Sequence, residues 1–135
     1  MIEKDYFMRL VATLFDAINQ IINGIENDDI ENVKIQIDHS YMLLGNESSF
    51  FIDEDFEEIL KLFKTKDGDY LKRVQMLSEL MYYDSLIQKN NELKNIILNK
   101  SIRLLEYYIK NTKEYSSEIN NKLIAMKNEY NSFSQ

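Results

Sequence analysis

The chain of 135 residues contains no proline and only three glycines, and this lack of helix breakers constrains its fold more than any other feature. Proline and glycine are the residues that most strongly interrupt helix interiors. Apolar residues recur at spacings of three and four along most of the chain, which is the pattern of amphipathic helices. No stretch of useful length alternates apolar and polar residues as a strand would. The sequence therefore predicts an all-α fold.

The apolar spacing predicts about six helices that pack as antiparallel hairpins. The first, fourth and fifth helices have broad apolar faces, and we expect them to be the most buried. The sixth has a narrow apolar seam and is expected to cap its neighbours. The helices are expected at about residues 5–23, 28–44, 53–63, 70–89, 91–111 and 117–133.

Polar residues and glycines mark the expected ends of these helices. Asp5 and Asp53 are placed to act as N-caps, because a side-chain carboxylate can accept hydrogen bonds from the first free N–H groups. Gly24 and Gly45 follow apolar runs and are expected to end their helices in a left-handed conformation. Residues 46–52 are predicted to form a loop.

The length suits a single domain, which we expect to span residues 1–135. The turn at 66–69, which contains Gly68, is the one candidate hinge. The chain has no cysteine, no apolar run typical of a signal peptide and no run of about 20 apolar residues. These features predict a cytoplasmic protein that does not cross a membrane.

The formal net charge of −7 is unevenly distributed. Residues 1–67 hold 6 basic and 15 acidic residues, a net charge of −9, whereas residues 68–135 hold 10 and 8, a net charge of +2. An acidic protein repels a phosphate backbone, so nucleic acid is not an expected partner.

No residue pattern indicates an enzyme, and no cofactor is expected. His39 is the only histidine, and no nucleophile lies near it in the sequence, so it is interpreted as a surface or boundary residue. The acidic cluster from Asp53 to Glu58 lacks the glycine that a calcium loop requires and is interpreted as the first turn of a helix. We therefore expect no metal site.

The aromatic residues are the remaining candidates for function. Tyrosine is favoured at interfaces because it buries a large area and keeps a polar tip. A possible interaction surface is predicted from Tyr82, Tyr107, Phe50 and Phe51. At least one of the two phenylalanines is also expected to fill the core, because a Phe-Phe pair exposed in a loop would be unusual.

Two segments carry a resemblance to a known family. Residues Asp5, Tyr6, Phe7, Met8 and Arg9, followed by the first apolar helix, resemble the opening of a family of small uncharacterised proteins from low-GC Gram-positive bacteria. Residues 76–108, a helix, a polar turn and a second helix, are similar to that family's tetratricopeptide-like hairpin. The resemblance implies a tetratricopeptide-like fold and supplies no activity.

The hairpin departs from true tetratricopeptide repeats in one respect. Those repeats need small residues where paired helices cross, and residues 76–108 contain neither alanine nor glycine. No second copy at a spacing of about 34 residues is visible.

These observations lead to two hypotheses. The first is a non-enzymatic helical module that binds a protein, either a partner peptide or a second copy in a homodimer that sets the acidic half against the less acidic one. The alternative is an enzyme or small-ligand-binding protein with a carboxylate-lined pocket. An apolar pocket with convergent polar groups would favour the alternative.

Overall fold

The computed structural model describes the backbone of residues 2–133 and the side chains of residues 5–132. Within this part of the chain every regular element is a helix, which confirms the all-α prediction. The seven helices are α1 (Ile2–Glu26), α2 (Ile30–Leu44), α3 (Ser48–Asp53), α4 (Phe56–Lys64), α5 (Tyr70–Ile87), α6 (Asn91–Asn111) and α7 (Ser117–Phe133).

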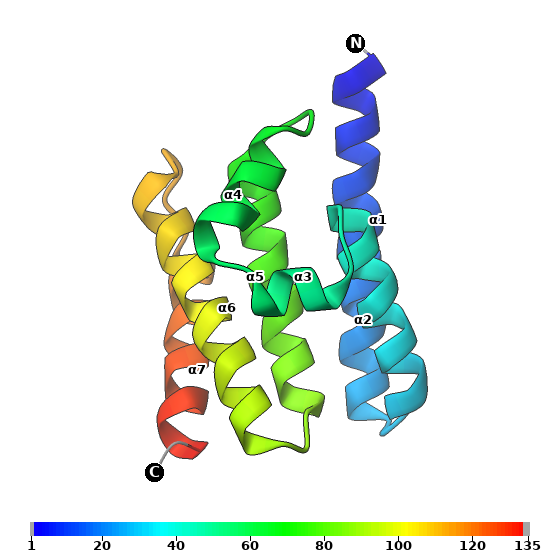
Figure 1. The fold of residues 1–135 in the computed structure, drawn as a ribbon, viewed down its shortest axis with the longest axis vertical. Helices are drawn as coiled ribbons and strands as arrows, with labels where there is room; N and C mark the ends of the chain where they lie inside the picture. The colour runs from blue at the N-terminus through cyan, green and yellow to red at the C-terminus, as the bar shows by residue number, and fades with distance from the viewer. Residues whose placement is uncertain (1, 134–135) are drawn as a thin grey trace.

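The long helices form antiparallel hairpins, as predicted. Figure 1 shows α1 and α2 side by side as one hairpin, and α5 and α6 as a second, with α7 alongside α6. The short helices α3 and α4 lead from the first hairpin across to the second. As a result, α1, α5 and α7 all run in the same direction.

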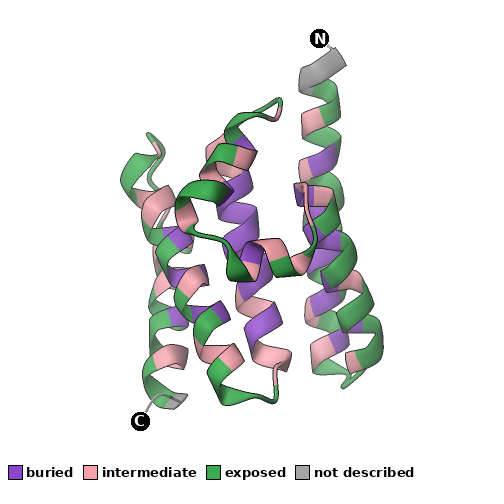
Figure 2. Cartoon of the chain, in the orientation of Figure 1, coloured by how far each residue is buried: buried purple, intermediate pink, exposed green. Residues whose placement is uncertain are grey.

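Helix α5 lies at the centre of the molecule and contacts α1, α2, α4 and α6. Its residues 73–81 are buried without interruption, as the continuous buried colouring of this helix shows (Figure 2). A helix that is buried on nearly every side must carry apolar residues around most of its circumference. The broad apolar face predicted for this segment is consistent with that position.

The first hairpin is tight because of a glycine whose expected role was different. The prediction that Gly24 ends the first helix is wrong, since α1 continues to Glu26. A Cβ atom at Gly24 would lie 2.5 Å from Cγ2 of Val33, so the glycine allows α2 to approach α1 closely. The left-handed residue of this connection is Asp28, with a φ of 58°. Gly45, with a φ of 127°, ends α2 as predicted.

Two expected helix starts are also wrong. Helix α1 begins at Ile2, so Asp5 lies inside it and is not its N-cap. Asp53 is the last residue of α3, and α4 begins only at Phe56. Acidic residues are compatible with the first turn of a helix as well as with its cap, so the sequence alone does not separate the two positions.

The loop predicted at 46–52 instead contains α3, which makes seven helices where six were expected. Phe51 is fully buried and stacks on Tyr41 with ring centroids 5.6 Å apart. Lys100 of α6 donates hydrogen bonds to the carbonyl oxygens of Phe51 and Ile52, both at 2.9 Å, and to that of Glu54. The last carbonyls of a helix lack partners within it, so this distant lysine stabilises α3.

We predict that the α5–α6 pair forms the part of the core on which stability depends most. Leu80 and Leu105 are 1% and 0% exposed. Replacing either by alanine removes buried methyl groups and leaves a cavity, which should lower the free energy of unfolding by about 2–5 kcal/mol. Urea unfolding measures this directly, and losses below about 0.5 kcal/mol at both positions would contradict the described core.

Candidate functional site

Buried polar side chains of α5 identify the places where the structure departs from a simple apolar core. Arg73, Ser78, Glu79 and Asp84 are all at most 5% exposed, although they lie in the most enclosed helix. Buried charges are costly unless they are paired or hydrogen-bonded. The partners of these side chains therefore show how α5 is connected to its surroundings.

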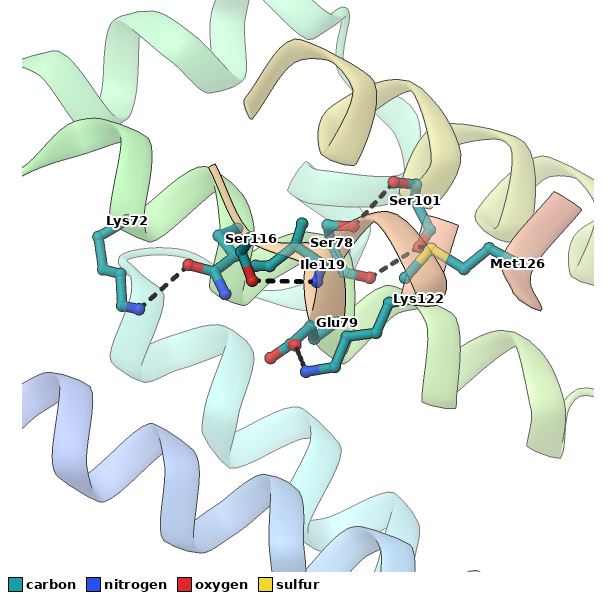
Figure 3. A network of polar contacts seen from close by, with 9 residues as sticks. Lys72, Ser78, Glu79, Ser101, Ser116, Ile119, Lys122 and Met126 are labelled. Carbon is teal, nitrogen blue, oxygen red and sulfur yellow. Dashed lines mark hydrogen bonds and ion pairs between the residues drawn. The ribbon is translucent and has the colours of Figure 1, made fainter. Parts of the chain in front are cut away.

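Two serines hold α5 against α6. The Ser78 hydroxyl donates to the carbonyl oxygen of Ser101 at 2.9 Å, and the Ser101 hydroxyl donates to that of Ser78 at 2.7 Å. Figure 3 shows the two serines facing each other across the helix crossing, with Met126 beside Ser101. Serine is small enough for close helix approach, so these residues occupy the place that alanine or glycine was expected to fill.

A groove lies between α5 and α7. We call it the α5–α7 groove; it is a hollow of about 240 Å³ lined by Glu79, Tyr82, Tyr83, Lys122, Ala125 and Met126. The Glu79 side chain is 5% exposed and forms an ion pair with Lys122, whose side chain is 38% exposed (Figure 3). The groove thus combines a charged pair with an aromatic and apolar lining.

The tyrosines of this groove are set in acidic surroundings. Burial raises the pKa of Tyr82, and the negative charge of Glu129 raises it further. Burial also raises the pKa of Tyr83, with a second contribution from Glu79. Both rings remain protonated at neutral pH and can donate hydrogen bonds. Their rings contact edge to face with centroids 5.2 Å apart, and together they form an aromatic wall of the groove.

A second hollow lies on another side of α5. We call it the Asp84 cavity; it measures about 260 Å³ and lies among α2, α3 and the turn between α5 and α6. Tyr41 donates to Oδ2 of Asp84 at 2.7 Å, and Gln88 donates to Oδ1 at 2.8 Å. The cavity is lined by Lys34, Ile37, Asp38, Ser48, Ile52, Asp84, Ile87, Gln88 and Leu93.

Asp84 differs from Glu79 in the kind of partner that it has. Both hydrogen bonds to Asp84 come from neutral donors, and within residues 5–132 no basic side chain forms an ion pair with it. Burial raises the pKa of Asp84, the hydrogen bonds from Tyr41 and Gln88 oppose this, and the nearby charge of Asp38 adds to the increase. Asp84 is thus a buried carboxylate that has no counter-charge.

The structure does not bring the four predicted surface aromatics together. Tyr82 lines the α5–α7 groove. Tyr107 packs edge to face on Phe56 of α4, and a hydrogen bond with Tyr70 raises its pKa to about 12. Phe50 is half-buried, and its ring contacts that of Phe51.

Phe51 itself is fully enclosed and offers no exposed ring. This confirms the expectation that at least one of the phenylalanines fills the core. It also removes Phe51 from the predicted interaction surface, because its buried ring stacks on Tyr41 and makes a tilted contact with Phe63.

The candidates for metal binding have ordinary positions. His39 is exposed, as expected. The cluster from Asp53 to Glu58 is divided between the end of α3 and the first turn of α4, which contains Glu57 and Glu58. Among the side chains that the structure describes, no three acidic or histidine residues are grouped so that they could hold a metal ion.

Sequence reasoning missed Glu79 and Asp84, because carboxylates are too numerous in this chain to single out, and it missed Lys122, because no local pattern marks its distant partner. One sequence signal could have identified the two carboxylates. Glu79 and Asp84 lie within a helix whose other residues are apolar around most of its circumference, so a charged side chain there must point into the protein.

Comparisons with protein-family models, with curated proteins and with solved structures find no match to this chain. The class of the protein is thus defined by its fold alone: it is an all-α protein built from helical hairpins. The resemblance to the Gram-positive family stays a prediction. Of the helices described, none combines the length and the apolar character needed to cross a bilayer.

The pH dependence of stability tests how Asp84 is held. The pKa of Asp84 is higher in the folded state than in the unfolded state, where it is about 3.9. The protonated carboxyl therefore favours folding. This contribution is fully present below the unfolded pKa and is lost as the pH rises through the folded pKa. The Asp84→Asn variant keeps an oxygen to accept from Tyr41, and Gln88 can turn its amide to accept from the new NH₂ group.

We expect Asp84→Asn to be at least as stable as the wild type at about pH 7, with this advantage disappearing as the pH falls to about 4. Urea unfolding of both proteins over this pH range measures the difference. A stability difference that does not vary with pH would show that the Asp84 charge has no part in it.

Proposed function

We propose that this chain is a non-enzymatic helical module that binds a basic, amphipathic peptide segment of another protein in the α5–α7 groove. The observation that carries the proposal is the groove itself, where the rings of Tyr82 and Tyr83 and the side chain of Met126 lie beside the buried Glu79. Aromatic residues and methionine are enriched where proteins bind one another.

The arrangement of the helices supports binding at this face. Stacked helical hairpins in repeat proteins present extended concave surfaces for their partners. Here α1, α5 and α7 run in the same direction, as the first helices of successive hairpins would (Figure 1). A tetratricopeptide-like role for these helices is part of the proposal.

The surface beside the groove can extend this contact. Lys72 of α5 lies over the ring of Phe15 on α1, 5.2 Å from its centroid. Met8 is seven residues before Phe15 and therefore lies on the same side of α1. It is 60% exposed, and Phe15 is 38% exposed. A peptide that leaves the groove toward α1 would thus meet further apolar side chains.

Charge favours a basic partner. The chain as a whole has a net charge of −7, which attracts a basic segment and repels a second copy at long range, while residues 68–135, which form the groove, have a net charge of +2. Within the groove, Glu79 has Lys122 as its counter-ion, and that lysine is itself partly exposed. A basic residue of a partner can therefore share the carboxylate without leaving a buried charge unpaired.

We predict that Ala125→Arg blocks the groove while leaving the fold intact. Ala125 lines the groove but is exposed, so a long side chain there enters the hollow without displacing core residues. Ile124→Arg is the matched control, because Ile124 is 56% exposed on the neighbouring position and lines none of the groove. Both variants add one positive charge to the same helix.

The test uses a display library of random peptides selected on the wild-type protein. We expect the enriched peptides to combine basic and apolar residues and to shift the NMR amide signals of Tyr82, Tyr83 and Met126. Ala125→Arg should weaken their binding by at least about tenfold, and Ile124→Arg by less than about twofold. Equal binding to all three proteins, or shifts confined to other helices, would refute the groove as the site.

Self-association is the second form of this proposal, in which the acidic half of one copy faces the less acidic half of another. Sedimentation at tens of micromolar protein in low and moderate salt distinguishes the two forms. A dimer that becomes monomeric in Ala125→Arg and persists in Ile124→Arg would identify a second copy as the occupant. A monomer under both conditions excludes it and leaves the peptide partner.

A further inference from the structure

The Asp84 cavity holds a feature of the core that the proposed function does not use. Asp84 is 4% exposed, yet its partners are a tyrosine hydroxyl and a glutamine amide, both neutral. The other buried carboxylate of α5, Glu79, has a lysine as its partner. Buried charges in proteins are generally paired with an opposite charge, so the lack of one at Asp84 requires an explanation.

The cavity offers room for a missing counter-charge. Its volume is about 260 Å³, and Asp84 forms part of its lining. A carboxylate can accept about four hydrogen bonds, and Asp84 accepts one at each oxygen. Each oxygen therefore keeps a free acceptor position.

The remaining lining indicates what kind of molecule fits. Four aliphatic side chains come from four different helices, namely Ile37, Ile52, Ile87 and Leu93. Binding sites for drug-sized molecules are larger, from about 300 to 1,000 Å³. A ligand of this cavity must accordingly be small, with an aliphatic body.

The charged residues at the cavity also bear on the sign of the ligand. Asp38 lies on α2 in the lining and adds a second negative charge, which raises the pKa of Asp84. Lys34 is the only basic residue of the lining; like Asp38 it is exposed, and it forms no ion pair with Asp84, which is the one buried charge of the lining. The interior of the cavity is thus negative, and it favours a cation.

We propose that the Asp84 cavity binds a small aliphatic primary amine, whose ammonium group pairs with the Asp84 carboxylate and whose alkyl chain packs on the surrounding isoleucines and leucine. An ammonium group has three donors and can use the free acceptor positions of the carboxylate. Binding supplies a counter-charge that no side chain among residues 5–132 provides through an ion pair. This inference is independent of the peptide groove, which lies on another side of α5, so either can fail without the other.

The experiment compares two probes of the same shape, isobutylamine and isobutanol, titrated into the full chain at neutral pH. NMR amide shifts at Asp84, Gln88, Ile52 and Leu93 report occupation of the cavity. We expect the amine to bind at least about tenfold more tightly than the alcohol, because a charge-assisted hydrogen bond is stronger than a neutral one. Equal affinities for the two probes would overturn the proposal.

Two variants assign the effect to Asp84. In Asp84→Asn the preference for the amine should disappear, so that both probes bind with the weak affinity of the alcohol. Asp16→Asn removes an equivalent charge from an exposed position on α1 and should leave the tenfold preference intact. An unchanged preference in Asp84→Asn would overturn the proposal, and if that variant does not fold, the comparison of the two probes on the wild type remains decisive.

Discussion

The burial of α5 on nearly all sides is the constraint on which the rest of the structure depends. A polar side chain in such a helix has little water to meet, so most find a partner within the protein, and several find it outside α5. Ser78 finds it in α6, Glu79 in α7 and Asp84 in α2. Arg73 donates to the carbonyl oxygen of Asp67 in the preceding turn and lies over the ring of Phe7 on α1. Helices α1, α2, α6 and α7 are therefore each joined to α5 by a specific side-chain contact as well as by apolar packing.

The two buried carboxylates of α5 show two ways of meeting this constraint. Glu79 has a lysine from α7, and its pair lies at the edge of a groove where α7 stands away from α5. Asp84 has only neutral hydrogen-bond donors, and it lines the Asp84 cavity among α2, α3 and the turn between α5 and α6. The first arrangement leaves an amphipathic groove suited to a peptide, and the second leaves a negative cavity suited to a small cation. Both functional proposals thus arise from the way the same helix buries charge.

The serine pair explains how the α5–α6 hairpin forms without the small residues of tetratricopeptide repeats. Ser78 and Ser101 are small enough for α5 and α6 to approach closely. The hydroxyl of each serine also donates a hydrogen bond to the backbone carbonyl of the other, which alanine or glycine could not do. Alanine and glycine alone do not mark this crossing, because neither residue occurs in positions 76–108. Including serine among the small residues would have indicated the crossing point, although not which serine pairs with which.

The sequence by itself determined the helices, because a helix depends on contacts three and four residues apart. The bounds expected for 91–111 and 117–133 agree with α6 and α7, and Gly45 ends α2 as predicted. Only the tertiary structure decided the rest. Helix α3 depends on Lys100, which lies 46 to 49 residues away from the carbonyls that it binds. The Tyr41–Asp84 and Glu79–Lys122 contacts each join residues 43 positions apart. No local pattern encodes such pairs, since they exist only once the packing of α5 has placed the two side chains against each other.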